Sequence, residues 1–177
     1  MKFIATPIAG VWQIELERQE DERGFFARSY CQQEFAKHGI HDAFTQMNIS
    51  YNQAQATLRG MHYQSQEAPE SKVVRCIAGA VYDVALDLRP ASPTFKRWFC
   101  IKLDSNHKSS LYIAPGIAHG FVTLTPGAEL LYLMGGTYVP QAACGVRWND
   151  PAFGIHWPIS PAVMSERDRT YPDFIPS

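Results

Sequence analysis

The sequence lacks a long hydrophobic run, a leader-like N-terminus and a strong excess of charge of either sign. No apolar segment approaches the roughly 20 residues of a membrane-spanning helix. Residues 1–7 carry a lysine but no extended apolar stretch. The formal net charge is −1, with 19% charged residues, which excludes a polybasic nucleic-acid surface. We therefore expect a soluble, cytoplasmic protein that binds neither a membrane nor nucleic acid.

Sequence motifs typical of metal sites or of redox-cofactor sites are also missing. The four cysteines, at positions 31, 76, 100 and 144, are widely scattered, and neither a C-x-x-C pair nor a His-x-His motif occurs. This spacing does not match a zinc site. The sequence has no Gly-rich dinucleotide motif either. We expect reduced thiols, no metal and no cofactor.

What the sequence does contain is many short apolar segments separated by Gly and Pro turns. Aromatic residues make up 12% of the chain, which suits a β-rich fold. The segments predicted as strands are residues 11–18, 73–77, 81–88, 98–103, 111–113, 120–124 and 130–134. In residues 81–88 two aspartates fall on one face of the strand and apolar residues on the other. Helix is expected only at residues 32–37 and as a turn near 165–168.

The expected architecture is an all-β jelly roll, a sandwich or barrel with a few short helices. At 177 residues the chain is long enough for one proper core. No repeat, low-complexity tract or linker divides it. We expect one domain covering residues 1–177.

Residues 59–64, Arg-Gly-Met-His-Tyr-Gln, combine a cation, an imidazole and a phenol. Further polar residues stand among apolar ones nearby, at Gln46, Asn48, Ser50, Lys72 and Arg75. Polar side chains on a core-facing strand are costly unless something uses them. The pattern predicts a ligand in the mouth of the barrel.

Several of these residues allow two interpretations. His62 is either a general base, since its ordinary pKa lies near neutrality, or a core histidine bonded to a backbone carbonyl. Arg59 and Lys72 favour the first interpretation because they bring two cations towards it. Arg23 is either a solvated surface charge or, with Arg59, a ligand for a diphosphate, which guanidinium groups bind bidentately.

Three more candidates are equally ambiguous from local sequence. Asp168 ends a Ser-Glu-Arg-Asp capping box, and a functional role requires it to fold back onto His62. Tyr132 is either a barrel-filling aromatic or a site residue with a partner for its hydroxyl. His119 is either a buried structural histidine or a ligand contact. A metal site would need clustered ligands, whereas His62 and His119 are far apart in the sequence.

Taken together, the chain resembles the dTDP-4-dehydrorhamnose 3,5-epimerases, cupin-like jelly rolls that act on nucleotide-linked 4-keto-6-deoxy sugars. The resemblance runs from Asp-Glu-Arg-Gly-Phe-Phe at 21–26 to Ser-Glu-Arg-Asp at 165–168. The motifs between these two are residues 46–50, 57–64, 72–76, 118–121 and 145–151. So many motifs in order are a specific signal.

The resemblance implies that His62 is the base, with Asp168 as its partner. It implies that Tyr132 is the acid on the opposite face of the sugar and that Lys72 lies near the keto oxygen. It assigns substrate binding to Arg23, Phe26, Gln46, Asn48, Arg59, His119 and Tyr138, with the two arginines on the diphosphate. It also implies a homodimer in which an N-terminal segment, including Arg23 and Phe26, crosses to the neighbouring subunit.

Some positions depart from the pattern of the family. Arg28 stands where many members have Glu, residues 133–136 (Leu-Met-Gly-Gly) replace a Lys and hydroxyl residues, and Gln141 replaces a Glu. The expected function is inversion of C3 and C5 of a nucleotide-linked, dTDP-type 4-keto-6-deoxyhexose in rhamnose-type biosynthesis. The alternatives are a mono-epimerase acting at one carbon, a metal-dependent cupin oxygenase and a non-catalytic sugar-nucleotide binder.

Overall fold

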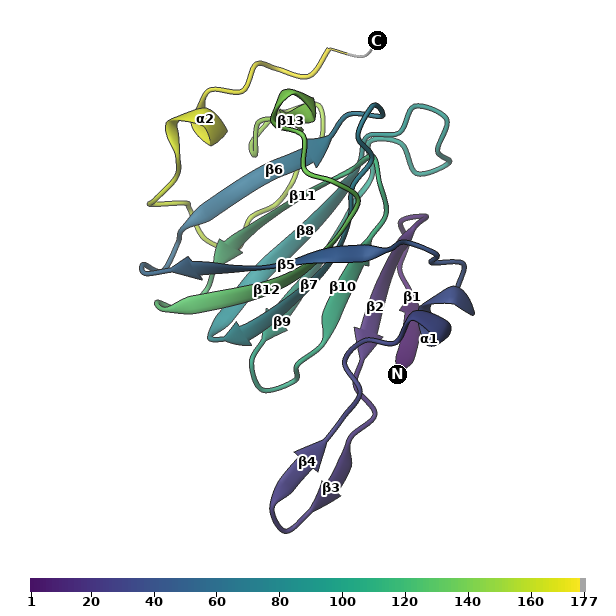
Figure 1. Ribbon diagram of the computed structural model, residues 1–177. Coiled ribbons are helices and arrows are strands. Elements are labelled where there is room, and N and C mark those ends of the chain that lie inside the picture. The colour runs from purple at the N-terminus through teal and green to yellow at the C-terminus, as the bar shows by residue number, and fades with distance from the viewer. Residues whose placement is uncertain (176–177) are drawn as a thin grey trace.

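A computed structural model describes residues 1–175. Two facing antiparallel sheets form most of the molecule (Figure 1), and the predicted all-β jelly roll is confirmed. The expected domain also included residues 176 and 177, which lie outside the described part, and its being a single domain stays a prediction. No helix within residues 1–175 is both long and apolar enough to cross a membrane.

The strands divide into two large sheets and one hairpin. The six-stranded sheet has the order β1 (Lys2–Ala5), β2 (Val11–Glu15), β10 (Ser110–Ile113), β7 (Ser71–Ala78), β12 (Ala128–Gly135) and β5 (Phe44–Asn52). The five-stranded sheet has the order β13 (Ala143–Gly145), β6 (Leu58–Gln64), β11 (Ile117–Thr123), β8 (Ala80–Asp87) and β9 (Trp98–Asp104). The remaining elements are the hairpin β3 (Gln19–Asp21) and β4 (Gly24–Phe26), helices α1 (Gln32–Ala36) and α2 (Glu166–Arg169), and the 3-10 helix η1 (Pro140–Ala142).

Most predicted strands and both predicted helices occur within a few residues of their expected bounds. The strand expected at residues 11–18 is shorter, because it ends at Glu15. Its pairing with β1 ends at Lys2↔Glu15 and its pairing with β10 at Ser110↔Ile14. A strand without a partner on either side loses its ladder hydrogen bonds, so the chain leaves the sheet there.

Both faces of the five-stranded sheet are buried. Val81 and Ala85 of β8 pack between the two sheets, whereas Val84 and Leu86 pack beneath residues 146–157 of the C-terminal segment. The two aspartates of β8, Asp83 and Asp87, therefore lie on the interior face of the sheet, and both are fully buried. A buried carboxylate needs compensating partners. Asp87 has several, whereas Asp83 meets His119 through Oδ2 and has no hydrogen-bond donor at Oδ1 among residues 1–175.

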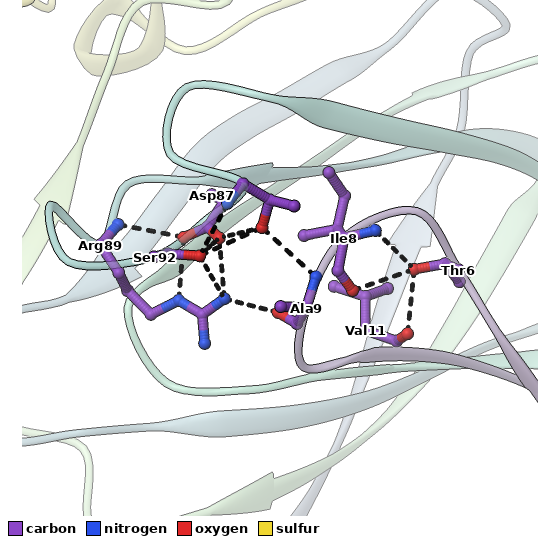
Figure 2. A network of polar contacts seen from close by, with 8 residues as sticks. Thr6, Ile8, Ala9, Val11, Asp87, Arg89 and Ser92 are labelled. Atoms are coloured by element: carbon purple, nitrogen blue, oxygen red, sulfur yellow. Dashed lines mark hydrogen bonds and ion pairs between the residues drawn. The ribbon is translucent and has the colours of Figure 1, made fainter.

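Asp87 is the centre of a closed polar network (Figure 2). Its carboxylate accepts hydrogen bonds from Arg89 Nε at 2.8 Å and from Thr94 Oγ1 at 2.6 Å, and Ser92 also donates to it. Thr94 Oγ1 accepts from the Ala9 backbone N–H. Burial opposes ionisation, but these donors outweigh it and lower the pKa of Asp87 to about 2. The network ties the end of β8 to the N-terminal loop.

Candidate functional site

A cavity of about 540 Å³ lies between the two sheets and receives side chains from both. The lining residues on the six-stranded sheet are Asn48, Ile49, Ser50, Lys72, Tyr132 and Met134. Those on or beside the five-stranded sheet are Thr57, Leu58, Arg59, His62, His119 and Phe121. Residues 163–165, Arg167 and Asp168 complete the rim. The predicted ligand site in the barrel mouth therefore corresponds to a real cavity.

His62 and Asp168 form a dyad on one wall of this cavity. His62 Nε2 lies 2.6 Å from Asp168 Oδ1, and the Gly60 backbone N–H donates to Asp168 Oδ2 at 3.2 Å. The Asp168 side chain is only 4% exposed, whereas the imidazole is 41% exposed. The dyad thus presents a solvent-accessible imidazole backed by a buried carboxylate.

The capping box and the dyad exist together. Ser165 Oγ accepts a hydrogen bond from the Asp168 backbone N–H at 3.1 Å, which caps α2. The Asp168 carboxylate is left free to reach β6, where it meets His62 and Gly60. Burial raises the pKa of Asp168, but the hydrogen bonds from His62 and Gly60 outweigh it, so the pKa is below its ordinary value. Asp168 is therefore an anion next to the imidazole at neutral pH.

Tyr132 and Lys72 lie on the opposite wall. Tyr132 is in β12 between Asn48 of β5 and Val74 of β7, and Lys72 pairs with Met134 in a neighbouring row of the same sheet. Burial raises the pKa of Tyr132 well above its ordinary value, and the nearby Asp83 charge adds to the effect while Arg59 opposes it. The phenol is therefore protonated at neutral pH and can act as a proton donor.

His119 has a second buried carboxylate as its partner. Its Nε2 lies 2.8 Å from Asp83 Oδ2, and both side chains are buried. The His119 ring meets the Tyr132 ring edge-on, with centroids 5.9 Å apart. His119 therefore has the buried partner expected of a structural histidine and also lines the cavity, whereas its contact with a ligand stays a prediction.

The binding residues expected from the resemblance divide into two groups. Arg59, Asn48 and His119 line the cavity, and Arg59 Nε donates to Asn52 Oδ1 at 2.7 Å. Four others do not line it, namely Arg23, Phe26, Gln46 and Tyr138. All four have exposed side chains. Their assignment to the substrate stays a prediction.

Arg23 and Phe26 belong to the β3–β4 hairpin, which projects away from the sheets (Figure 1). Phe26 is 75% exposed, and Arg23 contacts Asp21 within its own turn. Neither residue reaches the cavity of its own chain. The solvated-charge interpretation of Arg23 therefore describes the isolated subunit.

Three residues around the site were not singled out as site residues from the sequence. Asp83 and Glu70 are the buried partners of His119 and Lys72, and Met134 lines the cavity beside Lys72. The sequence did carry a signal for Asp83, since an aspartate within an apolar strand needs a partner. For Glu70, in a polar loop, local sequence carried none.

The departures from the family pattern lie in different places. Leu133 points away from the cavity and packs with Phe35 and Val73 on the outer face of its sheet. Met134, one residue on, lines the cavity. Arg28 is on the surface, paired with Glu34 at 3.0 Å. Only one side chain of the altered segment 133–136 therefore faces the site.

Within residues 1–175, no three His, Cys, Asp or Glu side chains converge in a way that would hold a metal ion. His62 and His119 are cross-strand neighbours on β6 and β11. Each directs Nε2 to its own aspartate, at 2.6 Å and 2.8 Å. The two imidazoles are thus committed to separate carboxylates.

Known proteins resemble this chain along nearly its whole length. The family described as dTDP-4-dehydrorhamnose 3,5-epimerase matches residues 5–175. An enzyme of that name from Salmonella typhimurium is 42% identical over 97% of this chain and 94% of its own. A dTDP-4-dehydrorhamnose 3-epimerase from Streptomyces niveus is 37% identical over 96% of this chain and 82% of its own. The crystal structure of a 3,5-epimerase from Elizabethkingia anophelis superposes with a TM-score of 0.95 at 36% identity, covering 98% of this chain and 96% of that one. With its jelly-roll fold and a His–Asp dyad facing a tyrosine across one cavity, the chain belongs to the dTDP-4-dehydrorhamnose 3,5-epimerase family.

Proposed function

We propose that the protein inverts C3 and C5 of a dTDP-linked 4-keto-6-deoxyhexose by removing a proton from one face of the sugar and returning one to the other. The observation that carries this proposal is the placement of the two proton-transfer groups. His62 belongs to the five-stranded sheet and Tyr132 to the six-stranded sheet, and both line the same cavity. A sugar held between them meets a base on one face and an acid on the other.

The first step is proton abstraction next to the ketone. His62 removes the proton on C3 or C5, and the electrons of the C–H bond move into the carbonyl to form an enolate at C4. Asp168, ionised and 2.6 Å from the imidazole, stabilises the imidazolium that results. Lys72, on the opposite sheet, stabilises the negative oxygen.

The second step is protonation from the opposite side. Tyr132, whose raised pKa keeps it protonated, gives its proton to the same carbon. The enolate collapses to the ketone, and the centre is inverted. The phenolate then recovers a proton from solvent while His62 loses one, so no proton is gained or lost overall. Positioned acid–base groups of this kind contribute roughly 10²–10⁴-fold each.

We further propose that the working form is a homodimer in which the N-terminal hairpin completes the neighbouring site. β5 is the last strand of its sheet, and its Met47, Ile49 and Tyr51 are exposed. An exposed apolar edge strand favours pairing with another chain. The projecting hairpin carries exposed Phe26 and an arginine suited to a diphosphate. Both features are accounted for by a partner subunit.

Subunit mixing tests this exchange. Arg23→Ala and His62→Asn chains are each expected to be poorly active alone. In a mixed dimer with exchanged hairpins, one site combines an intact His62 with an intact Arg23 and regains activity. If Arg23 serves its own chain, both mixed sites stay defective, so an absence of recovery in mixtures verified as heterodimers would contradict the exchange.

The expected cytoplasmic location likewise stays a prediction.

A mono-epimerase is the second candidate, and the side chain of Met134 favours it. Met134 stands between Gln46 and Lys72 on the cavity wall, in the segment that departs from the family. Its bulk narrows the space beside the proposed acid. Incubation with the dTDP-4-keto-6-deoxy sugar and NMR of the product decides between the two. Products inverted at both carbons support the double epimerase, inversion at one supports the alternative, and binding without any turnover would leave a non-catalytic binder.

A further inference from the structure

Lys72, the proposed stabiliser of the enolate, has a buried counter-ion. Its Nζ lies 2.8 Å from Glu70 Oε1. The lysine side chain is 10% exposed and the glutamate side chain 6%. Lys72 lines the cavity, whereas Glu70 does not. The carboxylate thus contacts the ammonium without lining the cavity itself.

Glu70 is itself fixed by a hydrogen-bonded chain. Its Oε2 accepts from Gln64 Nε2 at 3.2 Å, and the Gln64 amide also donates to the Thr137 carbonyl at 3.3 Å. Gln64 Oε1 accepts from the Val139 backbone N–H at 2.9 Å. Both oxygens of Glu70 therefore have a partner, and the carboxylate has little freedom to rotate. The carboxylate that contacts the ammonium is therefore held by β6 and by residues 137–139.

The glycines at the end of β12 make room for this arrangement. A Cβ at Gly136, where φ is +95°, would lie 2.5 Å from the Pro69 carbonyl oxygen. A Cβ at Gly135 would overlap the Ser71 hydroxyl. Only residues without a side chain allow the segment 69–71 to approach β12 this closely. The departure at residues 135–136 is therefore linked to the placement of Glu70 beneath Lys72.

We propose that Glu70 is a positioning residue for the epimerisation, holding the Lys72 ammonium at the point where the enolate oxygen forms. This inference rests on the proposed function. A buried ammonium that loses its counter-ion is left uncompensated, and its long side chain then gains rotational freedom. Electrostatic stabilisation depends on a donor fixed before the reaction begins. Glu70 contributes to the rate through Lys72 without contacting the substrate.

The test compares Glu70→Gln, Glu70→Asp and Lys72→Met with the wild type, using steady-state kinetics and deuterium uptake from D₂O. Glu70→Gln is expected to lower kcat roughly 10²-fold, the cost of displacing a reacting group by about 1 Å, while KM changes little. Glu70→Asp keeps the charge and is expected to recover part of the rate. Glu67→Gln, an exposed glutamate of the same loop, is the matched control and should behave as wild type.

A double-substitution cycle separates positioning from a merely structural role. If Glu70 acts only through Lys72, the Glu70→Gln/Lys72→Met chain should be no slower than Lys72→Met alone. Independent losses that multiply would overturn the inference, and so would a Glu70→Gln chain with wild-type kcat. Failure of the proposed function looks different, since the wild type itself would then take up no deuterium and form no epimer.

Discussion

Asp87 and Asp168 are both buried carboxylates with a depressed pKa, yet they sit in opposite kinds of surroundings. Asp87 accepts hydrogen bonds from Arg89, Ser92 and Thr94 (Figure 2), and none of these three residues lines the site cavity. Asp168 has a partner, His62, that is 41% exposed on the cavity wall. We therefore expect the Asp87 network to serve stability, and we propose that the Asp168–His62 pair serves proton transfer because its imidazole faces the cavity.

Replacing the open member should have the largest effect on catalysis. We expect His62→Asn to lower kcat roughly 10²–10⁴-fold, because the general base is removed. Binding of dTDP, measured by calorimetry, should stay close to wild type, since the imidazole is assigned to the sugar and not to the nucleotide. A chain that retained near wild-type turnover would remove His62 from the mechanism.

The two aspartates should then give opposite results when each is changed to Asn. Asp168→Asn should slow turnover, by less than His62→Asn because the imidazole remains, and should lower the melting temperature less than Asp87→Asn does, because Asn still offers an acceptor to the Gly60 N–H. Asp87→Asn should cost about 3 kcal/mol of stability, since Arg89 loses its buried counter-ion, while kcat per folded molecule stays the same. Thermal melts and kinetics on both chains check the contrast.

The contrast between the two aspartates would not hold if Asp168→Asn lowered the melting temperature and left kcat unchanged. In that case the capping of α2, and not the dyad, would be the role of this residue. A matched loss of kcat in Asp87→Asn would equally show that the closed network is coupled to the site.

The pH dependence of unfolding follows from the same comparison. The pKa of Asp87 falls from an ordinary value of 3.8 to about 2 in the folded chain. Its contribution to the free energy of unfolding is therefore complete above the ordinary pKa and is lost as the pH falls towards 2. This contribution is about 2 kcal/mol. Urea melts between pH 5 and pH 2.5 should lose stability in the wild type, and should lose less in Asp87→Asn. Parallel losses in the two chains would contradict the assignment.

The smallest expected effect is that of chelation. Each of the two cavity imidazoles is committed to its own aspartate, and none of the proposed steps uses a metal ion. Activity should persist after exhaustive dialysis against EDTA. Loss of turnover that one divalent ion restores would favour the cupin oxygenase or another metal-dependent reaction instead.

Much of the fold could be predicted because it rests on local patterns. Alternation and Gly/Pro turns located β7 to β12, and the capping box located α2. Which face of β8 is interior could not be read from its alternation, because residues 146–157 cover the apolar face and leave the aspartates inside. That reversal depends on contacts between segments far apart in the sequence.

The candidate site was predictable to the extent that its residues lie in recognisable motifs. The resemblance identified His62, Lys72, Tyr132 and Asp168, and all four line one cavity. Glu70 was not predicted, because its placement depends on glycines more than sixty residues later in the chain, at 135 and 136. The proposed role of Arg23 requires a second subunit, and the local sequence around this residue gives no sign of one.

The most direct test of opposite-face proton transfer is deuterium exchange in the Tyr132→Phe chain. His62 is exposed and its imidazolium can trade its proton with solvent, so removal of the acid should leave exchange on the base's face intact. In D₂O the recovered substrate should gain deuterium at C3 or C5 faster than epimer forms, whereas the wild type should incorporate deuterium with inversion at both carbons. Epimerisation by Tyr132→Phe at the wild-type rate would show that Tyr132 is not the acid.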